Sequence, residues 1–208
     1  MNKNVILLLF TLLFSLATRA EVKSDSTSIK ILLTGASFAD KGNTWFEMGC
    51  EQLGAIPLNR AKGGEAIANT ANKMHEGVLY TKEELEEIDA FVIMQVHNRD
   101  VYEDSQIKPA YTDYQMPIDR SNYAAAYDYV IKRYLSDCYN LKFDKNSSYY
   151  GSLTGKPALV VLCTDWHDAR TLYNESVRKL AAKWGFPLVE FDKYAGFSKH
   201  QLHPVTGA

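Results

Sequence analysis

The chain has 208 residues, of which 46% are hydrophobic, and a formal net charge of −2 at pH 7. This length suits a single domain with a sizeable core. The mild acidity provides no positive field for nucleic acid, so we expect no nucleic-acid partner.

The first twenty residues have the pattern of a secretory signal peptide. Lys3 gives a positive start, residues 5–16 are almost wholly apolar, and Thr18-Arg19-Ala20 ends in a small residue suited to cleavage. The apolar run is short for a membrane span of about 20 residues, so an uncleaved anchor is the weaker alternative. We expect cleavage near Ala20, a periplasmic or secreted protein and no membrane contact in the mature chain. Loss of Lys3 and Arg19 takes the formal charge to −4.

After a polar leader at residues 21–28, residues 29–208 read as one domain. Short apolar runs predict strands at 29–34, 55–58, 89–96, 157–164 and 187–191, and helices are predicted at 43–53, 65–76, 121–141 and 169–184. Thr81-Lys-Glu-Glu is a capping-box pattern that opens another short helix. Strands alternating with helices indicate an α/β fold with a parallel sheet covered on both faces. A final helix is expected after the last strand, and the sequence stops at Ala208.

Three cysteines show no metal-ligand spacing. Cys163 lies in an apolar run and is predicted to be a buried thiol. A Cys50–Cys138 bridge is an open alternative in an exported chain.

Four short stretches carry reactive or polar groups, and each follows a predicted strand. They are Gly35-Ala36-Ser37-Phe38, Asn59-Arg-Ala-Lys-Gly-Gly64, Gln95-Val-His97-Asn98-Arg99-Asp100 and His200-Gln-Leu-His203-Pro204. Loops that follow parallel strands share the carboxyl edge of the sheet, where ligands bind. A serine, an imidazole, a glycine N–H and a side-chain amide can together attack an acyl carbon and hold the resulting oxyanion.

The chemistry assigns a role to each position. Ser37 would be the nucleophile, and because a serine hydroxyl is inert near pH 7 without a base, His203 would take its proton. The backbone N–H groups of Ser37 and Gly64, with the Asn98 amide, would stabilise the oxyanion. One such donor is typically worth about 3–4 kcal/mol.

These four blocks resemble those of the SGNH hydrolases, also called the GDSL-like lipase/esterase superfamily. The resemblance runs from about residue 31 to residue 204, nearly the whole mature chain. It implies a three-layer α/β/α sandwich with a parallel, flavodoxin-like sheet. It also implies Ser37, Gly64, Asn98 and His203 as catalytic residues, with no metal and no cofactor.

Two positions depart from the family pattern. Ala36 stands where the family has an aspartate between glycine and serine, and His200 stands where the family has the acid that orients the catalytic histidine. Three alternatives replace that acid: Asp192 after the last strand, Asp165 after the strand at 157–164, or a Ser37–His203 dyad.

Three further side chains are predicted to line the substrate cleft: Phe38, His97 and Trp166. A metal site built from Asp165, His167 and Asp168 with His97 and Asp100 is a weaker interpretation, because a metal needs three or four converging ligands.

The sequence therefore favours an exported serine esterase acting on short acyl esters, such as acetyl groups on carbohydrate. The export signal, the aromatic-rich loops and the lack of a long apolar lid motivate this substrate class. One alternative is a catalytically weak or inactive carbohydrate-binding module on the same fold. Another is a transferase that passes the acyl group to an alcohol.

Overall fold

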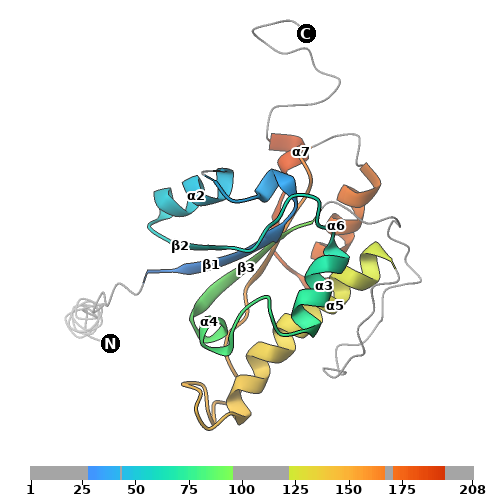
Figure 1. Cartoon of the computed structure of the whole chain (residues 1–208). Helices are drawn as coiled ribbons and strands as arrows, with labels where there is room; N and C mark the ends of the chain where they lie inside the picture. The colour runs from blue at the N-terminus through green and yellow to red at the C-terminus, as the bar shows by residue number, and fades with distance from the viewer. Residues whose placement is uncertain (1–27, 43, 96–121, 167–170, 195–208) are drawn as a thin grey trace, which may run out of the picture.

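The computed structural model describes residues 28–42, 44–95, 122–166 and 171–194. Its centre is a five-stranded parallel sheet with strand order β2-β1-β3-β4-β5 (Figure 1). The strands are β1 (Lys30–Gly35), β2 (Ile56–Asn59), β3 (Ile88–Met94), β4 (Val160–Cys163) and β5 (Leu188–Val189). This confirms the expected α/β class and the flavodoxin-like strand order.

Helices connect these strands on both faces of the sheet. Their bounds are η1 (Ser37–Ala39), α2 (Trp45–Leu53), α3 (Ile67–His75), α4 (Lys82–Glu87), α5 (Tyr123–Asn140), η3 (Leu141–Phe143), α6 (Thr171–Trp184) and α7 (Phe191–Tyr194).

The strand order reverses at β1. The chain leaves β1 toward β2 on one side and then crosses back to β3 on the other side. Leu33 of β1 pairs with Asn59 of β2 and with Val92 of β3. In open parallel sheets such a switch point opens a crevice at the carboxyl ends of the strands. The loop that begins at Ser37 follows β1 at this point.

Successive side chains of each strand point to opposite faces of the sheet. The core is therefore divided into two clusters, one on each face. The larger cluster lies under α3, α5 and α6, where Phe91 and Leu162 meet the fully buried rings of Tyr123, Tyr127 and Tyr134. The smaller cluster lies on the opposite face, under α2 (Figure 1). It contains Leu33, Phe46, Cys50, Met94 and Cys163.

All three cysteines are buried and free. The burial of Cys163 confirms the prediction for that thiol. Cys50 belongs to the cluster under α2, whereas Cys138 belongs to the cluster on the other face. The sheet separates the two side chains, so the Cys50–Cys138 bridge considered from the sequence does not form.

The capping box at Thr81 is confirmed. The Glu84 N–H donates to Thr81 Oγ1 at 3.1 Å, and the Thr81 N–H donates to Glu84 Oε2 at 3.0 Å. The last strand is shorter than expected, because Phe191 begins α7 instead of ending β5. The backbone N–H groups of Lys193 and Tyr194 turn back to the Glu190 carbonyl, which ends the extended conformation there.

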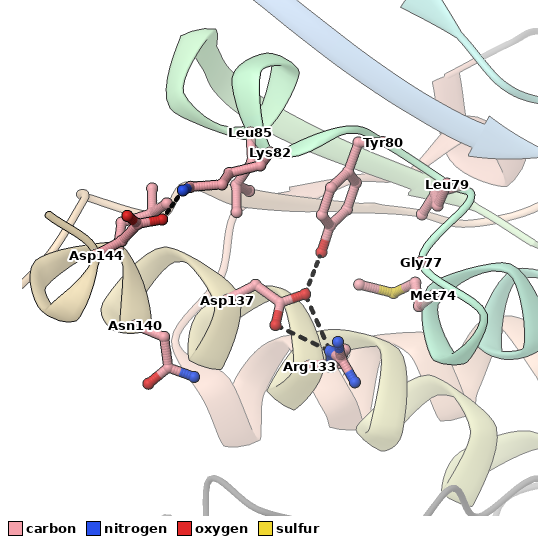
Figure 2. A pocket seen from close by; sticks show the side chains of 11 residues that line it. Met74, Gly77, Leu79, Tyr80, Lys82, Leu85, Arg133, Asp137, Asn140 and Asp144 are labelled. Carbon is pink, nitrogen blue, oxygen red and sulfur yellow. Dashed lines mark hydrogen bonds and ion pairs between the residues drawn. The ribbon is translucent and has the colours of Figure 1, made fainter. Parts of the chain in front are cut away.

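A pocket of about 300 Å³ lies between α3, α4 and α5, near the end of the sheet where β3 begins (Figure 2). The Tyr80 hydroxyl donates to Asp137 Oδ2 at 3.0 Å, and Arg133 Nε donates to both oxygens of that carboxylate at 2.9 and 3.0 Å. Lys82 pairs with Asp144 beside them. The acids of this pocket are thus neutralised by neighbouring cations. The strands are parallel, so this pocket and the Ser37 loop lie at opposite ends of the sheet.

Within the part of the chain that the structure describes, no helix is long and apolar enough to cross a membrane.

Candidate active site

Ser37 stands on a tight turn directly after β1. The Ala39 N–H closes this 3₁₀ turn on the Ala36 carbonyl at 2.9 Å. A Cβ on Gly35 would lie 2.8 Å from the Ala39 Cβ and 3.1 Å from the Met94 carbonyl oxygen, so the close turn requires glycine there. Ala36 and Ala39 are buried while the Ser37 side chain is exposed. The first N–H groups of such a turn have no partner within it, so the Ser37 N–H is available to a ligand.

The Gly63-Gly64 turn lies beside Ser37. A Cβ built on Gly63 would lie 3.9 Å from the Ser37 Cβ. Gly64 has φ +81°, a left-handed conformation that favours glycine. The structure therefore places the turn that contains Gly64 beside Ser37, so two of the four predicted catalytic residues lie on neighbouring turns.

Asp40 connects these two turns, and sequence reasoning did not identify it. Its Oδ2 accepts a 2.7 Å hydrogen bond from the Gly63 N–H, and its Oδ1 accepts a 2.8 Å bond from the Lys41 N–H. These two backbone hydrogen bonds lower the pKa of Asp40, and the bond from Gly63 is the larger cause. The only signal in the sequence is an aspartate three residues after Ser37.

Asn59 supports the same two turns from the buried side. Its Nδ2 donates to the Ala39 carbonyl at 2.9 Å and to Glu47 Oε1 at 2.6 Å, and its Oδ1 accepts from the Ala61 N–H at 2.8 Å. Burial acts to raise the pKa of Glu47, but hydrogen bonds from Thr44 and Asn59 outweigh it and lower that pKa. An ionised Glu47 thus holds the amide that anchors the serine turn to the end of β2.

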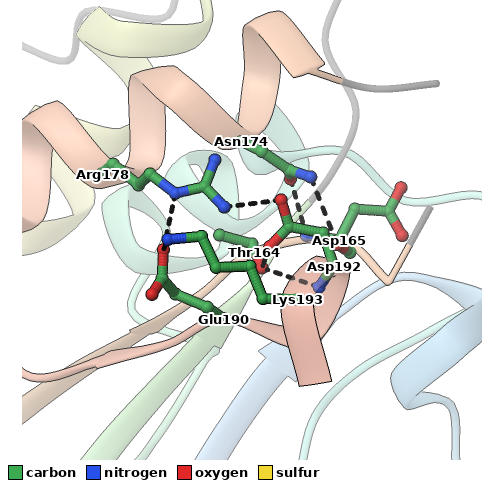
Figure 3. A network of polar contacts seen from close by, with 7 residues as sticks. All are labelled: Thr164, Asp165, Asn174, Arg178, Glu190, Asp192 and Lys193. Carbon is green, nitrogen blue, oxygen red and sulfur yellow. Dashed lines mark hydrogen bonds and ion pairs between the residues drawn. The ribbon is translucent and has the colours of Figure 1, made fainter. Parts of the chain in front are cut away.

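Asp192, one of the two candidate acids, lies in a polar network between β4, α6 and α7 (Figure 3). Its Oδ1 accepts from Thr164 Oγ1 at 2.7 Å, and its Oδ2 accepts from an Arg178 guanidinium nitrogen at 2.5 Å. Arg178 also donates to Glu190 at 2.7 Å. Hydrogen bonds from Arg178 and Lys193 lower the pKa of Glu190. Both oxygens of Asp192 are therefore engaged in holding α7 against the sheet.

Asp165, the other candidate acid, is held by its main chain. The Asp165 N–H donates to Asn174 Oδ1 at 2.8 Å, and the Asp165 carbonyl accepts from Asn174 Nδ2 at 3.3 Å. The residue is buried, with 3% of its surface exposed. Figure 3 shows its carboxylate pointing away from the Arg178–Asp192 ion pair. Asp165 thus has a fixed backbone at the carboxyl end of β4, and its carboxylate lies outside that network.

An aromatic pocket of about 410 Å³ begins one residue from Ser37, at Phe38. The rings of Phe38 and Trp166, both predicted to bind substrate, lie 5.8 Å apart. Three rings that sequence reasoning missed also line the wall of this pocket: Trp45, Phe191 and Tyr194. Phe191 lies 5.7 Å from Phe38 and 4.8 Å from Trp45. The Trp45 indole N–H donates to the Phe38 carbonyl at 3.0 Å, which fixes this wall to the serine turn.

Several predicted site residues lie outside the described part of the chain. They are His97, Asn98, His200 and His203. The metal interpretation also depends on residues outside it, namely His97, Asp100, His167 and Asp168.

No curated protein matches this sequence. One solved structure is 17% identical with a TM-score of 0.49, and the match covers 81% of this chain and 80% of the other. Another is a "putative SGNH hydrolase" from Slackia heliotrinireducens, 16% identical with a TM-score of 0.48, covering 87% of this chain and 89% of that one. A family model, in contrast, matches residues 28–208, so the chain belongs to the family described as a domain of unknown function (DUF5040).

Proposed function

We propose that this protein is an exported serine esterase of the SGNH type, with Ser37 as its nucleophile. The observation that carries the proposal is the position of the exposed Ser37 beside the Gly63-Gly64 turn, which Asp40 clamps at the switch point of the sheet. A nucleophile needs backbone donors within reach of the oxyanion that it creates. The Ser37 and Gly64 N–H groups are on adjacent turns, as that chemistry requires.

The reaction is acyl transfer in two steps. His203 takes the proton of Ser37 Oγ as that oxygen bonds to the ester carbon, and the carbonyl electrons move onto the oxyanion. The N–H groups of Ser37 and Gly64 and the Asn98 amide stabilise the oxyanion. Its collapse breaks the ester bond, and the departing alcohol takes the proton from His203. Water, activated by the same imidazole, then releases the acid and restores Ser37.

The histidine needs an orienting group, and Asp165 is the better of the two displaced acids. Both oxygens of Asp192 already accept hydrogen bonds from Thr164 and Arg178. Asp165 lies at the carboxyl end of β4, the edge of the sheet that Ser37 also occupies. His200 and a Ser37–His203 dyad remain the alternatives to an orienting carboxylate.

For the substrate we propose a short acyl group, such as acetyl, carried on a carbohydrate. The aromatic pocket beside Ser37 supports this class, since Phe38, Trp45, Trp166 and Phe191 provide flat apolar surfaces for a sugar ring. Export, proposed from residues 1–20, would place the enzyme where polysaccharides are found. Mass spectrometry of the secreted or periplasmic form would test cleavage near Ala20.

The first experiment is hydrolysis of p-nitrophenyl acetate by the chain without residues 1–20, beside Ser37→Ala and His203→Ala. We expect turnover in the parent chain and its loss in both variants, while circular dichroism shows all three folded. Activity that persists in Ser37→Ala would overturn the assignment of the nucleophile.

A carbohydrate-binding module is the second candidate, because the aromatic pocket does not depend on Ser37 and because Ala36 and His200 depart from the SGNH pattern. It predicts sugar binding that survives Ser37→Ala and no covalent labelling by a serine-reactive phosphonate. A transferase would react with the phosphonate in the same way as an esterase. It would, however, turn over the ester substrate faster when an alcohol is added as the acyl acceptor.

A further inference from the structure

A chain of buried hydrogen bonds lies beneath the candidate active site. Thr34 Oγ1 and Thr70 Oγ1 are 2.6 Å apart, and Gln95 Nε2 donates to Thr70 Oγ1 at 3.1 Å. All three residues are fully buried, at 0% exposure. Thr70 is the bridge, because its single hydroxyl contacts both of the others.

Each member of this chain belongs to an element that leads to a different site loop. Thr34 is in β1, three residues before Ser37, and Gln95 follows β3, three residues before Asn98. Thr70 is in α3, which begins shortly after Gly64. The three segments that provide the nucleophile, the glycine donor and the amide donor are thus connected through one hydroxyl group.

The main chain of Gln95 is fixed as firmly as its side chain. Its carbonyl accepts from the Tyr123 hydroxyl at 2.6 Å and from the Tyr127 hydroxyl at 2.9 Å, and its N–H donates to the Tyr127 oxygen at 3.2 Å. Burial raises the pKa of both phenols, and for Tyr123 the nearby Tyr127 and Asp165 add to the effect. Both phenols are therefore neutral hydrogen-bond donors near neutral pH.

The Oε1 atom of Gln95 is buried and has no hydrogen-bond partner among the described residues, although a buried polar atom without a partner is destabilising. An apolar side chain of similar size would avoid that penalty, but it would lose the bond to Thr70. The bond to Thr70 is therefore the contact that distinguishes a glutamine from an apolar residue at this position.

We propose that Thr70 and Gln95 are positioning residues, which set the spacing between the Ser37 turn and the oxyanion donors. The inference rests on the proposed esterase function and deepens it. Both side chains are fully buried, so we expect neither to touch substrate. They act through β1, α3 and the end of β3, and the catalytic groups lie on the loops that follow.

The test is the kinetics of Thr70→Val with p-nitrophenyl acetate in the full mature chain, expressed per active site titrated with a fluorophosphonate. Valine keeps the shape of threonine and removes only the bridging hydroxyl. We expect kcat to fall roughly 10- to 100-fold, since small misplacements near reacting atoms cost that much, while KM changes less than about threefold. Thr70→Ser, which keeps the hydroxyl, should restore most of kcat.

Ser176→Ala is the matched control, because it removes another buried hydroxyl that makes a hydrogen bond, to the Leu172 carbonyl at 2.9 Å, without touching this network. We expect no change in its kcat per titrated site. If Thr70→Val loses no more kcat than this control, or if Thr70→Ser fails to restore it, the positioning role is wrong. If the parent chain neither turns over the ester nor reacts with the fluorophosphonate, the proposed function itself fails, which is a separate outcome.

Discussion

The Asp40 carboxylate accepts a 2.7 Å hydrogen bond from the Gly63 N–H, and this contact joins the turn that carries Ser37 to the turn that carries Gly64. The two turns are more than twenty residues apart in the sequence. A Cβ at Gly63 would lie only 3.1 Å from that same carboxylate oxygen. The clamp thus explains the glycine at position 63, whereas Gly64 is required by its left-handed backbone conformation.

The first prediction concerns this clamp. Asp40→Ala should lower kcat for p-nitrophenyl acetate by about tenfold, because the Gly64 N–H is no longer held in place. Asp40→Asn should keep most of the activity, because an amide oxygen still accepts from Gly63. Equal losses in the two variants would show that the negative charge matters more than the hydrogen bond.

The clamp also has a defined pH dependence. Backbone donors lower the pKa of Asp40 in the folded chain. The stability that its ionised carboxylate gives to the two turns is therefore fully present at pH values above the ordinary carboxyl pKa. It is lost only as pH falls through the lower, folded-state pKa. We therefore expect Asp40→Asn to leave the neutral and alkaline limbs of the kcat profile unchanged. A change in kcat confined to neutral or alkaline pH would contradict the assignment of this pH dependence to the Asp40 carboxylate.

The second prediction separates the conformation of Gly64 from its function. Gly64→Ala should destabilise the fold by about 1–2 kcal/mol, because the position has φ +81° and alanine is strained there. Gly151→Ala is the matched control, with φ +71° and equally open surroundings. Both variants should lose similar stability in urea unfolding, but only Gly64→Ala should lose kcat. If both variants kept full activity, Gly64 would have no role at the oxyanion.

The sheet and its carboxyl edge could be predicted from the sequence, because their signals are local. The strand at β4 is an uninterrupted apolar run, since both of its faces are buried. The Thr81 capping box is complete within four residues. The proximity of Ser37 and Gly64 followed from one rule, that loops after parallel strands share an edge.

The contacts that organise the site could not be predicted, because each joins residues far apart in the chain. Asn59 holds Ala39 twenty residues away, and Gln95 reaches Thr70 across 25 residues. No periodicity or short motif in the sequence indicates such a pair of contacting residues. The sequence pattern wrongly places Phe191 in the last strand for a related reason, since its apolar character fits a strand and an aromatic wall equally well.

The third prediction concerns the aromatic wall. Trp166→Ala should raise KM for an acetylated oligosaccharide by about tenfold, because one of the ring surfaces of the pocket is lost. Hydrolysis of p-nitrophenyl acetate, which has no sugar to bind, should change less than about threefold. The control is Trp184→Phe, which alters a tryptophan of the other core. A larger effect on long-chain acyl esters than on the sugar ester would reassign the pocket to the acyl group.

The fourth prediction distinguishes the two candidate acids. Asp192→Asn should cost about 1–2 kcal/mol of stability, because it weakens the charge-assisted bond to Arg178 between partly buried side chains. Its activity per folded molecule should stay within about threefold of the parent. Asp165→Asn should instead lower kcat by roughly 10³–10⁴-fold, the loss typical of removing the carboxylate that orients a catalytic histidine. Full activity in both variants would point to a Ser37–His203 dyad, whereas a large loss in Asp192→Asn alone would show that the Arg178 network is part of the catalytic site.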